Sequence, residues 1–185
     1  LAILLTPPTY FLVLRSVKRF RAKQELVRHG GSEVVFIGDS ITHFWESNGR
    51  AVWDRYFAAG RYRAINLGFS GNGRMDGNMA DWIKTIPVSA IVLDCLPNCT
   101  YNTTRDSSDY FIGSIAYANP NVPVYLVNNF EYPQQFILPD NNDDMVKENI
   151  LIKDIGAVHR QRLFVILHKM GCGHRIKDLI IRQSH

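Results

Sequence analysis

The chain has 185 residues, of which 46% are hydrophobic and 21% charged, a composition that fits one globular domain and excludes intrinsic disorder. The formal charge of +4 comes from basic residues that are scattered or lie in two terminal segments, residues 15–28 and 159–182, without the interleaved aromatic side chains of a nucleic-acid site. Three cysteines, an odd number without the paired ligands of structural zinc, indicate free thiols and no metal.

The first fourteen residues, LAILLTPPTYFLVL, are apolar, but the run is too short to span a bilayer and Pro7 and Pro8 interrupt it. We therefore expect no stable membrane insertion. Residues 11–29 place apolar side chains among basic ones and predict an amphipathic surface helix that two glycines close. The chain lacks an initiator Met, which indicates a start further upstream, so a cytoplasmic and a secreted location both stay open.

Strands and helices are predicted to alternate through the middle of the chain. Segments of helical length, residues 75–86 and 104–118, separate short runs rich in β-branched and aromatic residues. Such alternation predicts an α/β fold, a three-layer α/β/α sandwich with a mostly parallel, doubly wound sheet. The predicted strands, each buried on both faces, lie within residues 33–40, 62–68, 89–95 and 122–129.

The C-terminal third is less regular. It predicts a helix at residues 142–153, a fifth strand at 162–168 and a last helix at 174–183. No linker divides the chain, so we expect an N-terminal apolar segment and helix in residues 1–30 and one domain in residues 31–185.

A candidate nucleophile follows the first predicted strand. Ser40 in Gly-Asp-Ser-Ile comes directly after a buried strand and before a helix, where backbone N–H groups carry partial positive charge. The carboxyl ends of parallel strands are also where α/β proteins collect reactive groups. The same pattern fits an ordinary helix cap, in which the Ser40 hydroxyl only accepts a backbone hydrogen bond.

Two later strand ends supply candidate donors for a negatively charged oxygen. Residues 66–72, NLGFSGN, include Gly71, whose backbone N–H a ligand can approach closely. Residues 94–98, DCLPN, end in Asn98, whose side-chain amide carries donors of the same kind. Either residue alone also fits a simple turn. Together with the Ser40 N–H they could form an oxyanion hole.

These three clusters resemble the SGNH, or GDSL-like, hydrolase superfamily, above all the catalytic subunits of platelet-activating-factor acetylhydrolase and related bacterial acetylesterases. The resemblance implies a flavodoxin-like fold, with Ser40 as nucleophile and Gly71 and Asn98 as oxyanion donors. The third motif departs from the family, because Leu-Pro-Asn stands where Gly-x-Asn is usual. The likeness runs through residues 31–135 and includes NFEYPQQF, residues 129–136, as a loop over the site.

The resemblance also implies a C-terminal Asp-x-x-His motif that supplies the general base, and no histidine of this chain has an aspartate three positions before it. Three explanations are open, in this order of preference. The chain is truncated or frame-disrupted past about residue 150. Alternatively His174, after a glycine turn, is a substitute base oriented by Asp154 or Asp178. As a third explanation, the domain is inactive and keeps a binding pocket.

Four residues near these motifs are candidates for contact with substrate. Asp39 would anchor the loop through backbone hydrogen bonds, and His43 would share a helical face with Ser40. Asn72 and Arg74 stand beside the predicted oxyanion glycine, where Arg74 could attract an anionic substrate. The simpler interpretation, which we prefer, is a polar residue on the rim of the cleft for His43 and a solvated surface residue for Arg74.

The sequence therefore predicts an esterase or acetylhydrolase that cleaves small ester or O-acetyl groups through an acyl-enzyme on Ser40, with no metal or organic cofactor. The alternative is a catalytically impaired or truncated domain that binds an acylated carbohydrate or lipid. The expected partner is in either case a small acylated molecule and not a nucleic acid. Oligomeric state and substrate identity are not set by the sequence.

Overall fold

The computed structural model describes residues 7–29, 33–58, 63–129, 139–158 and 164–167. Its centre is a five-stranded parallel sheet in the order β2-β1-β3-β4-β5. That order is the flavodoxin-like arrangement of doubly wound sheets, and it confirms the predicted α/β class. The strands are β1 (Val34–Gly38), β2 (Ala64–Gly68), β3 (Ala90–Asp94), β4 (Val124–Val127) and β5 (Phe164–Leu167).

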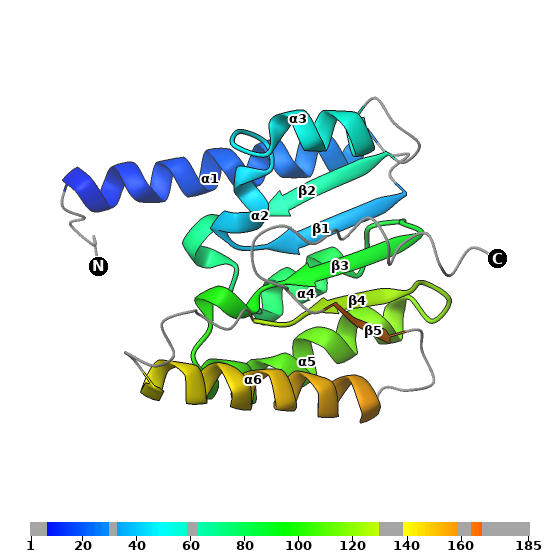
Figure 1. Cartoon of the computed structure of the whole chain (residues 1–185). Coiled ribbons are helices and arrows are strands. Elements are labelled where there is room, and N and C mark those ends of the chain that lie inside the picture. The colour runs from blue at the N-terminus through cyan, green and yellow to red at the C-terminus, as the bar shows by residue number, and fades with distance from the viewer. Residues whose placement is uncertain (1–6, 30–32, 59–62, 130–138, 159–163, 168–185) are drawn as a thin grey trace.

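Helices cover both faces of the sheet, as Figure 1 shows. One long helix precedes the first strand, and the other helices and several short turns connect the strands. The helices are α1 (Pro7–Arg28), α2 (Ser40–Phe44), α3 (Arg50–Trp53), α4 (Gly77–Ile83), α5 (Tyr101–Ala118) and α6 (Pro139–Val158), and the short turns are η1 (Asp54–Ala58), η2 (Ser70–Asn72) and η3 (Leu96–Asn98).

Alternation along the strands places two apolar sets on opposite faces of the sheet. Val35 and Ile37 of β1 belong to the larger cluster, which the side chains of α4, α5 and α6 complete. Val34 and Phe36 belong to the smaller one, and the rings of Trp53 and Phe36 lie 5.4 Å apart. The sheet is therefore buried on both sides, as the continuous apolar runs predict.

The first helix begins at Pro7, four residues before the predicted start. Both prolines lie in the first turn, where the missing N–H costs no helical hydrogen bond and the fixed φ suits a helix. The interruption that the sequence suggested is therefore a helix start. Within the residues that the structure describes, no helix combines the length and apolarity needed to cross a bilayer.

Other boundaries shift by a few residues, which is usual where helix ends are set by caps and not by the apolar pattern. The α4 helix is shorter than predicted because Asp76 caps it, and its side chain accepts the Asn78 N–H at 2.9 Å. The α5 helix begins earlier because Thr100 caps it. The predicted helix at 174–183 lies outside the described residues.

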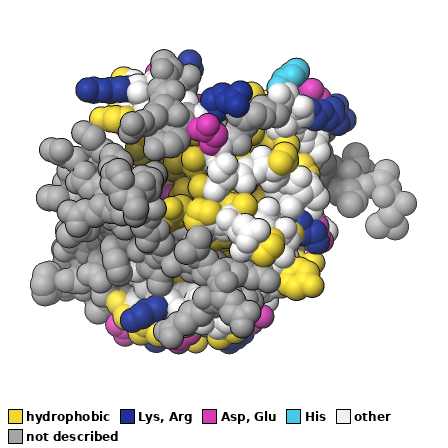
Figure 2. All heavy atoms as spheres, turned by 90° about the vertical axis from the view of Figure 1, so that its right-hand side faces the viewer, with side chains coloured by type: hydrophobic (Ala, Val, Ile, Leu, Met, Phe, Trp, Pro, Cys, Tyr) yellow, Lys and Arg dark blue, Asp and Glu magenta, His cyan; other side chains and the backbone are white. Residues whose placement is uncertain are grey.

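The carboxyl ends of the first three strands meet at one edge of the sheet. Gly38 at the end of β1 is in register with Gly68 of β2 and with Asp94 of β3. In Figure 1 the arrowheads of these strands point left, toward α2. Figure 2 views the opposite, amino side, where Lys and Arg side chains are spread around the described surface without forming one patch.

Candidate active site

The strand order fixes where a ligand site is expected. In a doubly wound sheet the connections after neighbouring strands run to opposite faces where the strand order reverses, and they leave a crevice at the carboxyl edge. Here the reversal lies between β1 and β3, whose following residues are Asp39 to Ser40 and Cys95 to Asn98. The predicted nucleophile and the predicted amide donor thus flank the switch point.

Ser40 is the first residue of α2 and is half-buried. The cap of this helix is Asp39, whose Oδ1 accepts a hydrogen bond from the Ile41 N–H at 2.7 Å. The Asp39 carbonyl accepts the His43 N–H at 3.0 Å. Asp39 therefore has the anchoring contacts that were expected of it. Ser40 is not the cap, which removes the simplest structural explanation for its hydroxyl.

The loop after β2 packs directly on the backbone that precedes Ser40. A Cβ atom on Gly73 would lie 2.4 Å from the Gly38 carbonyl oxygen and 2.9 Å from the Asp39 nitrogen. No side chain fits in that space, so glycine is required for the two backbones to touch. The Phe69 N–H adds a hydrogen bond to the Gly38 carbonyl at 2.9 Å. The predicted oxyanion loop and the nucleophile loop are therefore neighbours.

Gly71 presents open space at this edge. It is the second residue of η2 and exposed, and a Cβ atom there would meet none of the described residues within 4 Å. The N–H groups of the first residues of a helical turn have no partner within it. Ser70 just before it has φ 58°, in the left-handed region that a non-glycine residue seldom adopts. Strained backbone of this kind concentrates at functional sites.

Asn98 reaches across to the same loop. Its Nδ2 donates a hydrogen bond to the Ser70 carbonyl at 2.8 Å. A side-chain amide has two hydrogens, and this bond uses one of them. The sequence predicted an amide aimed at an oxyanion. The structure shows an amide that is fixed in place by the η2 loop and keeps a second hydrogen.

Three buried polar residues beneath the loops were not predicted. The Thr42 hydroxyl of α2 donates to Asp94 Oδ2 at 3.3 Å. Asn66, in the middle of β2, donates to the Thr42 carbonyl at 2.6 Å and accepts the Gly68 N–H at 2.8 Å. These bonds tie α2 to both neighbouring strands. A polar residue inside the buried run INLG was the sequence signal that could have identified Asn66.

Asn72 and Arg74, two predicted substrate contacts, are exposed beside Gly71. Arg74 Nε donates a hydrogen bond to the Gly71 carbonyl at 3.0 Å. The guanidinium therefore supports the loop that carries the predicted oxyanion N–H. Contact with substrate stays a prediction for both residues.

His43 is half-buried on α2. Its backbone lies over the end of β2, because a Cβ atom on Gly68 would fall 2.3 Å from the His43 nitrogen. Burial lowers the pKa of this imidazole, and the positive charge of Arg19 lowers it further. Its Nδ1 is buried and has no hydrogen-bond partner among the described residues. His43 is thus predominantly neutral at neutral pH, and its contact with substrate stays a prediction.

A second polar cluster follows β4 at the same edge. Asn129 Nδ2 donates to Glu148 Oε2 of α6 at 3.0 Å. The Asn129 N–H donates to Asn149 Oδ1 at 2.8 Å, and Asn149 Nδ2 donates to the Asn129 carbonyl at 3.2 Å. Burial raises the pKa of the Glu148 carboxyl. These contacts fix the chain just before residues 130–138, which include most of the predicted covering loop and lie outside the described residues.

The thiol beside this cluster is not reactive. Burial raises the pKa of Cys99 to about 11, and the carboxylate of Glu148 contributes to the rise. A thiolate is the nucleophilic form of cysteine, so Cys99 is protonated at neutral pH.

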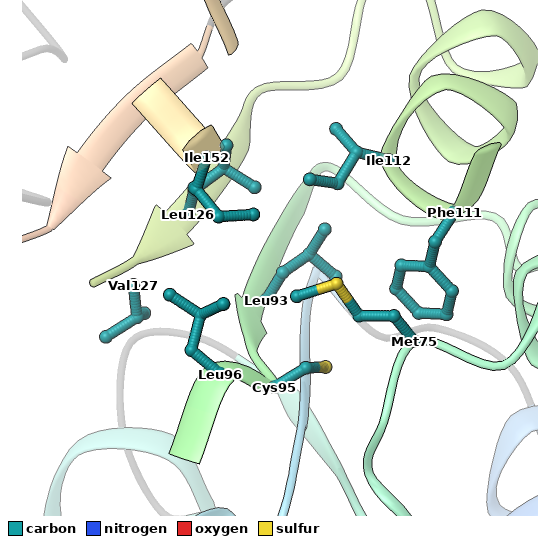
Figure 3. Close-up of a pocket in the computed structure, with 9 residues that line it drawn as sticks. All are labelled: Met75, Leu93, Cys95, Leu96, Phe111, Ile112, Leu126, Val127 and Ile152. Atoms are coloured by element: carbon teal, nitrogen blue, oxygen red, sulfur yellow. The ribbon is translucent and has the colours of Figure 1, made fainter. Parts of the chain in front are cut away.

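Figure 3 shows a small void under η3, lined by apolar side chains from two strands, β3 and β4, from the helices α5 and α6, and from η3 and the adjoining loops. Leu96 of η3 points toward it, as do Phe111 of α5 and Ile152 of α6. Its volume of about 10 Å³ is at the limit for one water molecule, and a dry apolar lining offers no polar partner. The void belongs to the core and is too small for a substrate.

The structure gives no position for the predicted general base. His174 and Asp178 lie outside the described residues. Asp154, the other predicted orienting acid, is exposed near the end of α6. The base therefore stays a prediction. The loops that carry Ser40, Gly71 and Asn98 are neighbours, and the catalytic roles of these three residues also stay predictions.

A serine at the start of a helix after the first strand lies next to a glycine loop, and an asparagine after the third strand donates a hydrogen bond to that loop. This is the order of motifs that the SGNH class carries. The chain belongs to the GDSL-like lipase/acylhydrolase family, whose model matches residues 32–170. This match confirms the resemblance that the three motifs carried. No curated protein matches the chain.

Two solved structures are similar to this one. A GDSL-like lipase from Bacteroides ovatus shares 21% identity with a TM-score of 0.64, over 76% of this chain and 43% of that protein. The salicylyl-acyltransferase SsfX3 from a tetracycline biosynthetic pathway shares 18% identity with a TM-score of 0.61, over 78% of this chain and 45% of its own. This chain thus spans less than half the length of either relative. At such identities the likeness establishes the fold.

Proposed function

We propose that this chain is a serine hydrolase that cleaves small ester or O-acetyl groups through an acyl-enzyme on Ser40. The observation that carries the proposal is the contact among three strand-end loops. The Gly73 backbone packs on the backbone before Ser40, and Asn98 donates to Ser70 in the loop of Gly71. The family membership supports ester chemistry in general.

The reaction would begin with attack of the Ser40 Oγ on the substrate carbonyl carbon, while a base takes the hydroxyl proton. The carbonyl oxygen becomes negative and would be held by the N–H groups of Ser40 and Gly71 and by the second amide hydrogen of Asn98. Collapse of this intermediate breaks the bond to the alcohol, which leaves with the proton. Water then attacks the acyl-enzyme by the reverse sequence and releases the acid.

The base in this proposal is His174, oriented by Asp154 or Asp178. A serine hydroxyl needs such a partner at neutral pH, and its loss typically costs several orders of magnitude in rate. If the chain has no base, the oxyanion donors alone would leave weak activity over water.

The test is covalent labelling followed by turnover. A fluorophosphonate probe should label Ser40, and Ser40→Ala should abolish both labelling and the hydrolysis of a short-chain acetyl ester. Ser47→Ala is the matched control, since Ser47 is exposed a few residues later and its Oγ donates only to local groups. It should keep full labelling.

The alternative function predicts a different outcome. A binding module would retain an acylated carbohydrate or lipid without hydrolysis, and the probe would label no serine. A cooperative thermal transition in the same preparation would show that the absence of labelling does not come from an unfolded chain.

A further inference from the structure

Three polar side chains are buried beneath the helix that begins with Ser40. Thr42 of α2 and Asn66 of β2 are each 3% exposed, and Asp94, the last residue of β3, is 9% exposed. A polar group in a core lowers stability unless hydrogen bonds replace its contacts with water. A helix and two strands that only formed the core would therefore be expected to carry apolar side chains at these positions.

The hydrogen bonds of these residues hold α2 from both sides of the strand that it follows. Thr42 is the shared partner, because its hydroxyl donates to Asp94 Oδ2 and its carbonyl accepts from Asn66 Nδ2. The Asn66 amide is itself fixed, since its Oδ1 accepts the Gly68 N–H. The strands β2 and β3, which carry Asn66 and Asp94, are the two neighbours of β1 in the sheet.

The helix α2 depends on such contacts for its direction. It has five residues, whereas an isolated helix needs about 12 to 15 residues to be even marginally stable in water. The Thr42 carbonyl near its end accepts the Trp45 N–H at 3.3 Å and takes a second hydrogen bond from Asn66. The place of Ser40 in the first turn of α2 is therefore set by the two strands and not by the helix alone.

The same two strands lead into the loops of the predicted oxyanion donors. The end of β2 is followed by η2 with Gly71, and the end of β3 is followed by η3 with Asn98. The packing leaves little space for movement, because a Cβ atom on Gly38 would lie 2.5 Å from the Asp94 carbonyl oxygen and still closer to Thr42 Oγ1. Thr42 thus connects the helix of Ser40 with both strand ends that lead to the donors.

We propose that Thr42, Asn66 and Asp94 are positioning residues, which hold Ser40 in the place where one ester carbonyl can meet both its hydroxyl and the oxyanion donors. Resting on the function proposed above, this role needs no contact with substrate, since all three side chains are buried and act through α2. A displacement of about 1 Å at a reacting centre can reduce a rate about a hundredfold. The network should therefore affect the rate of each folded molecule and not only the fraction that is folded.

Two substitutions of Thr42 separate its hydroxyl from its shape. Thr42→Val removes the hydroxyl and keeps the branched side chain, whereas Thr42→Ser keeps the hydroxyl. With a short-chain acetyl ester, Thr42→Val should lower kcat at least about tenfold at an unchanged KM, and Thr42→Ser should keep most of the parental kcat. The kcat is calculated per site titrated to completion with a fluorophosphonate probe, so that unfolded molecules do not count.

Ser108→Ala is the matched control for the loss of a buried hydroxyl. Ser108 is fully buried in α5, a helix without any of the predicted catalytic residues, and its hydroxyl donates to the Thr104 carbonyl. This change should lower the denaturation midpoint as Thr42→Val does and leave kcat per titrated site at the parental value. An equal fall of kcat in Ser108→Ala would overturn the proposal, because any buried hydroxyl would then have the same effect.

A double variant tests whether Thr42 aligns Ser40 with a donor. When Asn98→Ala has removed the amide, less is gained from alignment with it, so Thr42→Val should lower kcat by a smaller factor than it does in the parent. Equal factors in the two backgrounds would overturn the proposal, because Thr42 would then act independently of the donor.

The remaining outcomes separate this role from the function on which it rests. A parental kcat per titrated site in Thr42→Val, or a Thr42→Ser variant as slow as Thr42→Val, would overturn the positioning role and leave the hydrolase intact. A parent chain that neither takes the probe nor cleaves the ester would contradict the hydrolase, and the positioning role with it.

Discussion

The two sides of the candidate site are built in different ways. On the Ser40 side, backbone lies directly on backbone, and a Cβ atom on Gly73 would come within 2.4 Å of the Gly38 carbonyl. On the β4 side, Asn129 is held by side-chain hydrogen bonds to Glu148 and Asn149. Close packing of one backbone on another positions the first side, and hydrogen bonds around the buried carboxyl group of Glu148 position the second.

This difference predicts different sensitivities. Contact between backbones does not change with pH or salt, so the Ser40 loop and the η2 loop keep their relative geometry wherever the protein is folded. A buried carboxyl group gains or loses charge with pH, so the β4 side becomes less stable where Glu148 ionises. Substitutions at the backbone contact should therefore change the free energy of unfolding, substitutions of the predicted oxyanion donors should change the rate, and substitution of Glu148 should change how stability depends on pH.

The largest effect is expected at the backbone contact. Gly73→Ala places a methyl group inside the van der Waals radius of the Gly38 carbonyl and the Asp39 nitrogen, neither of which can move without shifting β1. We expect a loss of about 3 kcal/mol or more in the free energy of unfolding. Chemical denaturation measures it. A parental midpoint would show that the two loops do not touch.

Asn98→Ala should affect rate more than stability. Removing one oxyanion donor costs about 3 kcal/mol of transition-state stabilisation, a hundredfold or more in kcat. The lost hydrogen bond to Ser70 should cost only about 1 kcal/mol of stability.

The matched control for Asn98 is Asn119→Ala. Asn119 Nδ2 also donates to a backbone carbonyl, that of Ile115 at 2.9 Å, but at the end of α5. It should lose similar stability and keep the parental kcat. Equal kcat values for the two variants would exclude Asn98 from the reaction.

Gly71→Ala should show that Gly71 and Gly73, two glycines of one loop, have different roles, the first in the reaction and the second in stability. A methyl group at residue 71 meets no atom of the described part of the chain within 4 Å, so the denaturation midpoint should stay close to that of the parent, in contrast to Gly73→Ala. We expect kcat/KM to fall about tenfold, because the methyl group stands beside the N–H that substrate must approach. An unchanged kcat/KM would place the oxyanion elsewhere.

Glu148→Gln should give the smallest effect, and only at some pH values. Burial raises the Glu148 pKa, so the folded state holds the proton more tightly than the unfolded state, and stability falls as pH rises from the ordinary glutamate range through the raised pKa. The glutamine keeps an acceptor for Asn129 and removes the buried charge. Thermal melts should show a variant more stable than the parent at neutral pH and equal to it at about pH 4.

Asp143→Asn is the control for that profile, since Asp143 is an exposed carboxylate on the same helix. Its difference from the parent should not follow the same curve. A Glu148→Gln profile parallel to that of the parent would mean that Glu148 does not titrate in the folded state over this range.

Much of the site was accessible to sequence reasoning because each motif is local. The position of Ser40 follows from a buried strand and a helix start within a few residues, and the glycines after β2 follow in the same way. The alternative in which Ser40 only caps the helix could not be decided from the sequence, since Asp39 and Ser40 both suit a cap by residue type, and the structure shows that Asp39 is the cap. The general base could not be found, because the family's local signature for it is absent from the chain.

The sequence by itself determined the class of fold and the order of its strands along the chain, since apolar periodicity and turn residues act over short distances. The tertiary structure alone decided which strand ends meet, that Asn98 reaches Ser70 from 28 residues away, and that Thr42 reaches Asp94 from 52 away. Hydrogen bonds over such separations depend on how the sheet is ordered and how closely its loops pack, and no local pattern of residues carries that information.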